Sequence, residues 1–141
     1  MSEEMRHFNY LTTEIDTAYH EAALRLGLND SSMLILYAIC NNGDECLLGD
    51  ITRLSGISKQ TLNSALRKLE NENIVYLESI GGKRKKVCLT DIGKSLVERT
   101  VCRVITIEND IFDSWTEAER KLYIELTQKY LTSFKEKIKN L

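Results

Sequence analysis

The sequence contains no proline, a single tryptophan and only two histidines. Because proline is the residue that most often interrupts a helix, its absence makes long helices easier to form. With only His7 and His20, and with no two cysteines in a C-x-x-C spacing, the chain has no zinc-binding motif. It also has no glycine-rich phosphate loop and no nucleophile elbow. We therefore expect no metal site, no cofactor and no enzymatic activity.

Long hydrophobic runs are missing as well. No apolar stretch approaches the roughly 20 residues that cross a bilayer, and the polar start Met-Ser-Glu-Glu-Met-Arg has no signal-peptide core. We expect a cytoplasmic protein with no membrane partner, in which the cysteines are reduced. The cysteines are Cys40, Cys46, Cys88 and Cys102. Cys46 follows an expected exposed turn, where a thiol redox switch is an alternative to a structural role.

The charge of the chain is small but unevenly distributed. The 141 residues are 43% apolar and 28% charged, with a net charge of −2, as in an ordinary globular domain. Residues 51–90 hold eight cations and three acids, a net charge of +5, so the rest of the chain carries −7. An acidic body with one basic lobe is the distribution expected when a single face meets phosphates.

Residues 50–90 have the layout of a winged helix-turn-helix. Ile51, Leu54 and Ile57 have the spacing of a short helix, whose apolar residues we expect to pack against the helix that follows. Gly56 suits the positive φ of the tight turn between them. After the second helix, residues 74–80 are rich in β-branched and aromatic residues and predict a strand. Gly81-Gly82 then reverses the chain, and residues 86–89 return as its partner, so the hairpin tip carries the four consecutive cations of Lys83–Lys86.

The second helix has two faces that can be distinguished in the sequence. Ser58 occupies the N-cap position. Four apolar residues follow at helical spacing and predict one buried stripe: Leu62, Ala65, Leu66 and Leu69. The other faces carry amide, hydroxyl and cationic groups, which read donor and acceptor patterns in the major groove of DNA. From this helix we predict DNA contacts by Ser58, Lys59, Gln60, Thr61, Asn63, Ser64 and Arg67. From the hairpin we predict contacts by Lys83, Arg84 and Lys85 with phosphates or the adjacent minor groove.

The order of these motifs resembles the MarR family of bacterial transcriptional regulators. The resemblance is carried by Gly56-Ile-Ser-Lys-Gln-Thr61, Leu66-x-x-Leu-Glu70, the basic hairpin and Leu89-Thr-Asp-Ile-Gly93, and it extends over the whole chain. It implies a homodimer built from the N- and C-terminal helices, and repression by occluding a promoter. It also implies a small aromatic effector bound between the dimer helices and the winged lobe. Many members have an Asp two residues before an Arg in the wing; here Gly81 and Lys83 occupy those positions, or Arg84 matches the Arg if one residue is deleted.

The flanks of this lobe predict long amphipathic helices. We expect a single domain, 1–141, that is mainly α with a small β-hairpin (α+β), with the lobe at about 30–90 and dimerisation helices at about 3–27 and 91–141. The segment 91–111 is expected to form one helix capped by Thr90 or Asp91, in spite of its β-branched residues. Close backbone packing is a plausible reason for glycine at position 93. Thr116-Glu-Ala-Glu119 predicts a capping box for the last helix.

These features predict a homodimeric regulator that binds an inverted-repeat operator in double-stranded DNA, with Arg67 and Gln60 as the base-contacting residues. The alternative is a winged-helix adaptor, whose hairpin docks an acidic protein without specific DNA binding. Tyr19 and Tyr37, with Trp115, are candidates for an aromatic effector pocket, although core packing explains the same residues more simply.

Overall fold

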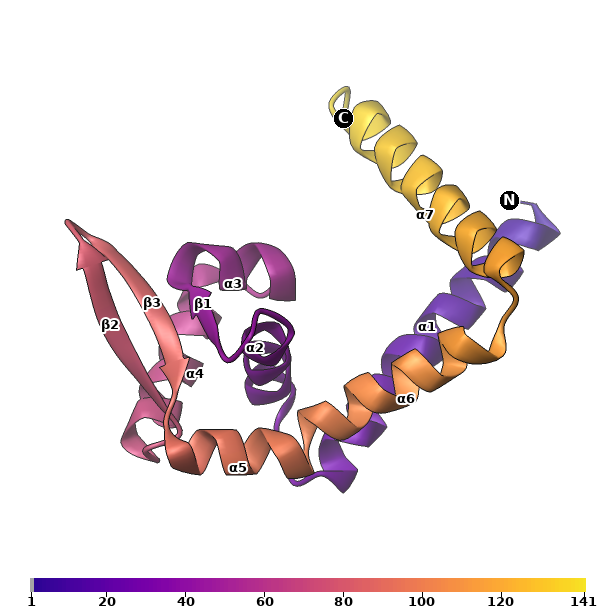
Figure 1. Cartoon of the computed structure of the whole chain (residues 1–141). Helices are drawn as coiled ribbons and strands as arrows, with labels where there is room; N and C mark the ends of the chain where they lie inside the picture. Colours follow the sequence, from indigo (N-terminus) through magenta and orange to yellow (C-terminus); the bar gives the residue numbers. More distant parts are fainter. Residues whose placement is uncertain (1) are drawn as a thin grey trace. The chain divides into compact units, whose positions relative to one another are not determined.

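The computed structural model describes residues 2–141 and divides them into two compact units, one up to Val104 and one from Ile105 to Leu141. The fold is mainly helical with a small antiparallel sheet, as the sequence predicted (Figure 1). The prediction of one domain over the whole chain stays a prediction. In chain order the elements are α1 (Glu3–Arg25), α2 (Asp30–Asn41), β1 (Glu45–Leu47), α3 (Leu48–Ser55), α4 (Lys59–Asn71), β2 (Val75–Gly81), β3 (Arg84–Leu89), α5 (Asp91–Arg99), α6 (Val101–Ser114) and α7 (Glu117–Ile138).

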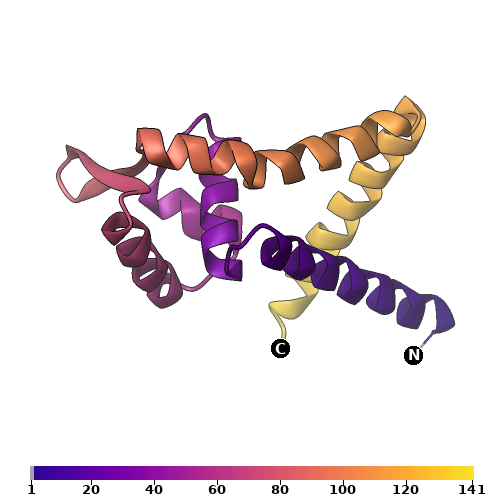
Figure 2. The ribbon, with the colours of Figure 1, turned by 90° about the horizontal axis from the view of Figure 1, so that it is seen from below.

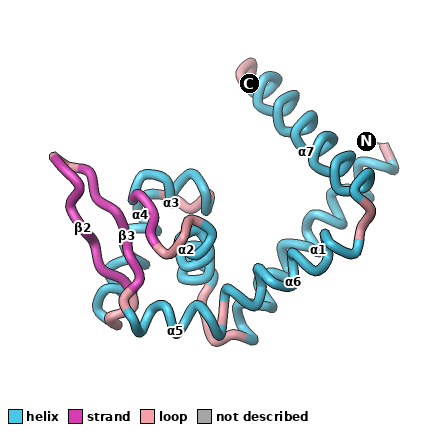
Figure 3. The backbone as a smooth tube through the Cα atoms, in the orientation of Figure 1, coloured by secondary structure: helices cyan, strands magenta, loops and turns pink. Residues whose placement is uncertain are grey.

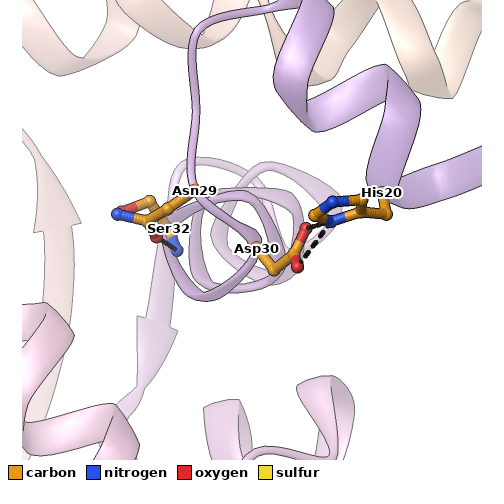
Figure 4. Close-up of polar contacts among 4 residues, drawn as sticks. All are labelled: His20, Asn29, Asp30 and Ser32. Carbon is orange, nitrogen blue, oxygen red and sulfur yellow. Dashed lines mark hydrogen bonds and ion pairs between the residues drawn. The ribbon is translucent and has the colours of Figure 1, made fainter.

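The connection between α1 and α2 is fixed by local polar contacts (Figure 4). Gly27 ends α1 with a φ of 73°, a conformation that costs glycine little. The side chain of Asn29 caps α2 by accepting a hydrogen bond of 2.8 Å from the backbone N–H of Ser32. The Nδ1 atom of His20 lies 2.9 and 2.8 Å from the two carboxylate oxygens of Asp30. These contacts define the end of α1 and the start of α2.

The sheet has three strands: the two strands of the predicted hairpin, and β1, at a segment for which the sequence allowed either a small strand or a turn. Its order is β1-β3-β2, and both pairs are antiparallel. Figure 3 shows that the β2–β3 hairpin extends beyond the helices that pack beside its base. Because side chains alternate along a strand, Val87 and Leu89 face the core, whereas Lys86 and Cys88 lie on the opposite face. A register shift between Ser79 and Gly81 marks the approach to the tip.

The core of the first unit lies between α2, α3, α4, α5, the first turn of α6 and the sheet. It contains residues from every one of these elements, and the most deeply buried large side chains are Ile35, Leu36, Ile39, Ile51, Leu62, Val87 and Val101. Leu54, which we expected to pack against α4, is 48% exposed, because α3 turns only one narrow face to the core. Cys46, expected to be exposed, is only 5% exposed because β1 directs its side chain into the core.

Gly93 allows the first turn of α5 to approach the chain that precedes β2. A Cβ atom at this position would lie 2.1 Å from the carbonyl oxygen of Ile74, far inside any tolerable contact. Thr90 caps α5 by accepting a hydrogen bond of 2.9 Å from the N–H of Gly93, and its hydroxyl donates to the carbonyls of Asn73 and Ile74. The inferred reason for glycine at position 93 is therefore confirmed.

The segment predicted as one helix after the hairpin is two helices. α5 ends at Arg99 and α6 begins at Val101, because Thr100 departs from helical geometry with φ −126° and ψ −95°. The hydroxyl of Thr100 donates a 2.7 Å hydrogen bond to the carbonyl of Leu96, which is a local alternative to the helical ladder. The prediction of an unbroken helix was wrong at this residue, and helix α6 then runs from the first unit into the second.

The second unit contains the rest of α6 and α7. The predicted capping box is present: Thr116 accepts from the N–H of Glu119, and Glu119 accepts from the N–H of Thr116. Phe112, Trp115 and Tyr123 form an aromatic cluster at the turn, with ring centroids 5.0 to 6.0 Å apart. No residue of α7 is buried. Within residues 2–141 no helix is both long enough and apolar enough to span a membrane.

Candidate nucleic-acid interface

Helix α4 presents a continuous polar face because its apolar residues are confined to one stripe. Leu62, Leu66 and Leu69 are buried, and Ala65 is half-buried, as predicted. Their arrangement leaves the seven residues predicted to contact DNA exposed on the other faces of the helix. In Figure 2, α4 and the hairpin lie at the same end of the first unit. The geometry therefore gives this end a helix with an uninterrupted polar surface.

The first two turns of α4 are organised by Ser58. Its hydroxyl oxygen accepts a hydrogen bond of 3.1 Å from the backbone N–H of Thr61, and its hydroxyl group lies 2.9 Å from the Thr61 hydroxyl. Gly56, at φ 73°, makes the left-handed turn that separates α3 from this cap. Ser58 and Thr61 therefore position the start of the helix. Gln60, Asn63 and Arg67 are among the exposed side chains of α4 that take no part in these cap contacts.

The cationic residues of the hairpin lie partly in strand rather than in the loop. Gly81 and Gly82 form the reversal with φ values of 120° and 58°, which favour glycine. Lys83 follows at the tip, and Arg84 and Lys85 are the first residues of β3. All three cationic side chains are exposed.

Lys86 differs from its three neighbours because two carboxylates hold it against the sheet. Its Nζ atom lies 3.1 Å from a carboxylate oxygen of Glu45 and 3.8 Å from one of Glu78, and its side chain is 24% exposed. The hydrogen bond to Glu45 is the main reason that the pKa of Lys86 is raised above its ordinary value. Of the four consecutive cations at the tip, this leaves Lys83, Arg84 and Lys85, the three predicted to contact DNA, for an external partner.

Two different elements supply the cations that remain available. Within residues 2–141, none of the five cationic residues of the predicted site takes part in an ion pair: Lys59, Arg67, Lys83, Arg84 and Lys85. Arg53 differs, because it lies 3.4 Å from Asp50 one turn earlier in α3. Exposed cations that have no internal counter-charge attract external anions most strongly.

A cavity of about 370 Å³ connects the helix with the hairpin. Leu47, Leu48 and Leu62 contribute apolar walls where β1, α3 and α4 meet. Its remaining lining includes five of the predicted DNA-contacting residues, from two elements: Lys59, Asn63, Lys83, Arg84 and Lys85. The structure therefore brings the start of α4 and the hairpin cations around one concave surface, while Gln60, Ser64 and Arg67 lie along α4 outside this lining.

Sequence reasoning missed the contribution of the segment where β1 runs into α3. Gly49 and Thr52 also line the cavity. No motif in the sequence identifies these residues, since their position depends on the pairing of β1 with β3. The spacing of polar residues on one helix cannot predict which strand will lie beside it.

The residues predicted for an effector pocket are not brought together at this cavity. Tyr19 is a partly exposed residue of α1, and Tyr37 is half-buried in α2, where it packs against the core. Trp115 belongs to the aromatic cluster of the second unit. The effector assignment of Tyr19 and Tyr37 stays a prediction. Throughout the described part of the chain, no group of three or more His, Cys, Asp or Glu side chains is arranged to hold a metal ion.

Comparison with known proteins relates this arrangement to a protein family. A family model described as MarR family matches residues 26–85, the segment that holds α2 to α4, β2 and the start of β3. No curated protein matches the chain. The resemblance read from the motifs between Gly56 and Gly93 is therefore confirmed.

Solved structures of MarR regulators share the fold over nearly the whole chain. NMB1585, a MarR family regulator from Neisseria meningitidis, is 14% identical, with 96% of each chain covered and a TM-score of 0.79. MepR of S. aureus, in its complex with DNA, is 19% identical, covering 95% of this chain and 98% of that one, with a TM-score of 0.69. Bordetella bronchiseptica BpsR, whose DNA binding is regulated by 6-hydroxynicotinic acid, is 20% identical, covering 88% and 93%, with a TM-score of 0.61.

Proposed function

We propose that this chain, identified as MarR-type by the family match over residues 26–85 and by its fold, is a sequence-specific DNA-binding regulator of transcription. One observation carries the proposal: exposed cations from α4 and from the hairpin, none of which takes part in an ion pair within residues 2–141, surround one concave surface. A polyanion is the partner that this charge arrangement fits, and DNA is the polyanion bound by MepR, which has the same fold.

Within this interface, base contacts are assigned to Gln60 and Arg67 on α4. Gln60 can pair with the edge of adenine and Arg67 with that of guanine, whereas Ser58 and Thr61 are already used at the helix cap. Lys59, Asn63 and Ser64 are assigned to the groove walls. Lys83, Arg84 and Lys85 are assigned to phosphates or the minor groove beside them, which carry affinity more than sequence information.

The proposal includes a homodimer, because two helices expose rows of large apolar side chains. In α1 these residues include Phe8, Leu11 and Ile15, and in α7 they include Leu122, Leu126, Tyr130, Phe134 and Ile138. Exposed apolar rows of this length mark surfaces for association. A two-fold dimer would bind an inverted repeat whose half-sites lie about one helical turn, roughly 10 base pairs, apart. Such a site overlapping a promoter would make the protein a repressor.

The proposed function also includes regulation by a small aromatic molecule. BpsR has the same fold and responds to 6-hydroxynicotinic acid, an aromatic acid. Tyr19 and Tyr37 are the residues assigned to such an effector here. Adding aromatic acids to a DNA-binding assay, with Tyr37→Ala as the altered protein, tests this part separately from DNA binding itself.

The main experiment is selection of bound sequences from a random DNA pool, followed by titration of the selected site at several salt concentrations. We expect an enriched inverted repeat and an affinity that falls steeply with salt. Light scattering of the free protein should give the mass of a dimer. Failure to enrich any sequence, with no salt-sensitive binding at micromolar protein, would favour the adaptor function instead.

A further inference from the structure

Two cysteines that are distant in the sequence meet inside the first unit. Cys40 lies in the last turn of α2 and Cys102 in the first turn of α6, and their Sγ atoms are 3.1 Å apart. Both side chains are half-buried, and among residues 2–141 no disulfide joins any of the cysteines. A disulfide bond is about 2.05 Å long, so the two sulfurs need to approach by only about 1 Å to form one.

We propose that Cys40 and Cys102 form a dithiol site that hydroperoxides oxidise reversibly to an intramolecular disulfide. The proximity of the sulfurs carries this inference, and it does not depend on the function proposed for α4 and the hairpin. Cys46 was the cysteine that the sequence suggested for redox chemistry, but it is buried in the core. Cys88 is also buried, with its Sγ 3.9 Å from a carboxylate oxygen of Glu78.

The reaction balances with one hydroperoxide per disulfide. One of the two sulfurs attacks the hydroperoxide, breaking its O–O bond, so that a sulfenic acid forms on that cysteine and an alcohol, or water from hydrogen peroxide, leaves. The other sulfur then attacks the sulfenic sulfur, forming the S–S bond and releasing water. The two sulfurs lose two electrons to the peroxide oxygens, and both thiol hydrogens leave in the alcohol and water.

The surroundings of Cys40 favour its protonated form. Burial raises the pKa of Cys40 to about 12, and the hydrogen bond and charge of Cys102 act in the same direction, as does the charge of Asp44. Cys40 therefore keeps its proton at neutral pH, and the thiolate is the reactive form of a cysteine.

The disulfide would close a loop that contains the whole helix-turn-helix and hairpin. The cysteines are 62 positions apart, and α3, α4, β2, β3 and α5 all lie between them. Cross-linking a loop of this length restricts the unfolded chain and stabilises the folded one. We expect the oxidised protein to have a Tm several degrees above that of the reduced protein.

The experiment treats the purified full-length protein with millimolar hydrogen peroxide and maps its peptides without reduction. The expected product is a monomeric chain lighter by two hydrogens, with one cross-linked peptide pair containing Cys40 and Cys102, restored by dithiothreitol. This test uses the unaltered protein, so its result does not depend on whether a variant folds. Cys102→Ser should abolish the cross-link, whereas the matched Cys88→Ser protein should retain it.

Two results would overturn the proposal. One is peroxide-treated protein in which Cys102 carries sulfinic or sulfonic acid and no peptide pair is joined. The other is a disulfide map dominated by links between different chains or by Cys46 or Cys88. A cross-link between Cys40 and Cys102 that leaves the Tm unchanged would support the chemistry and overturn the stabilisation expected from it.

Discussion

Two adjacent lysines, Lys85 and Lys86, should differ strongly in how much their replacement by alanine weakens DNA binding. Lys85 is exposed and takes part in no ion pair among residues 2–141, whereas Lys86 is held between Glu45 and Glu78. The two residues have the same charge and neighbouring positions in β3, so each is the control for the other. We expect Lys85→Ala to weaken DNA binding and Lys86→Ala to leave it nearly unchanged.

The size of the effect follows from the release of counterions. Each phosphate contact contributes about 0.9 to the slope of log affinity against log salt. The proposed dimer would lose two contacts when Lys85 is replaced, so the slope should become shallower by about 1.8. Between 50 and 200 mM salt, the disadvantage of the variant should therefore shrink about tenfold. Lys86→Ala should keep the original slope and instead lower the Tm, because Glu45 and Glu78 lose the cation between them.

Fluorescence anisotropy with a labelled operator, repeated at four or five salt concentrations, measures both slopes. Random DNA of the same length is a second probe, on which the Lys85 variant should lose as much as on the operator, since phosphates carry no sequence information. Equal slopes for the unaltered protein and Lys85→Ala would refute the assignment of Lys85 to phosphate. An equal change for both variants would refute the argument that Lys86 is neutralised by the sheet.

Three further expectations concern the helix, the close packing and the capping box. Arg67→Ala should weaken the free energy of binding to the preferred operator by about 1 to 3 kcal/mol and that of binding to random DNA by less. Equal losses of binding free energy on both DNAs would contradict the assignment of a base contact to Arg67. Gly93→Ala should lower the free energy of unfolding in urea by at least about 2 kcal/mol, because the new methyl group meets the Ile74 carbonyl; an unchanged midpoint would contradict that contact. Hydrogen bonds from the backbone and side chain of Thr116 lower the pKa of Glu119 below its ordinary value of 4.5. The ionised Glu119 carboxylate therefore stabilises the fold above pH 4.5, and this stabilisation is lost as the pH falls through the pKa of the folded state. The stability difference between the unaltered protein and Glu119→Gln should therefore narrow in acid, and a difference independent of pH would contradict the assignment.

Features set by neighbours in the sequence were predictable. The cap of α4 depends on Ser58 and Thr61, three positions apart, and the buried stripe depends on a periodicity that a single helix contains. The capping box at Thr116 and Glu119 is equally local. Close packing at Gly93 was predictable because glycine disfavours the helical conformation relative to alanine, and the approach of Ile74 explains why glycine is present.

Features that depend on distant pairing were not predictable in the same way. The three residues of β1 are too few to show an alternating pattern, and they form a strand only because β3 is available as a partner. The pairing that brings Glu45 beside Lys86 removes one of the four cations, which no count of charges along the sequence can anticipate. The end of α5 at Thr100 was missed because β-branched residues are compatible with both helix and strand.

The direct passage from β1 into α3 has a mechanical consequence. Leu47 is the last residue of β1 and also the N-cap position of α3, so no spare residue separates the sheet from the helix. Because β1 pairs with β3, we expect a bend of the hairpin to move β1 and, through Leu47, the first turn of α3. Two glycines inserted after Leu47 would separate β1 from α3, and we expect the sheet and the helix then to move independently.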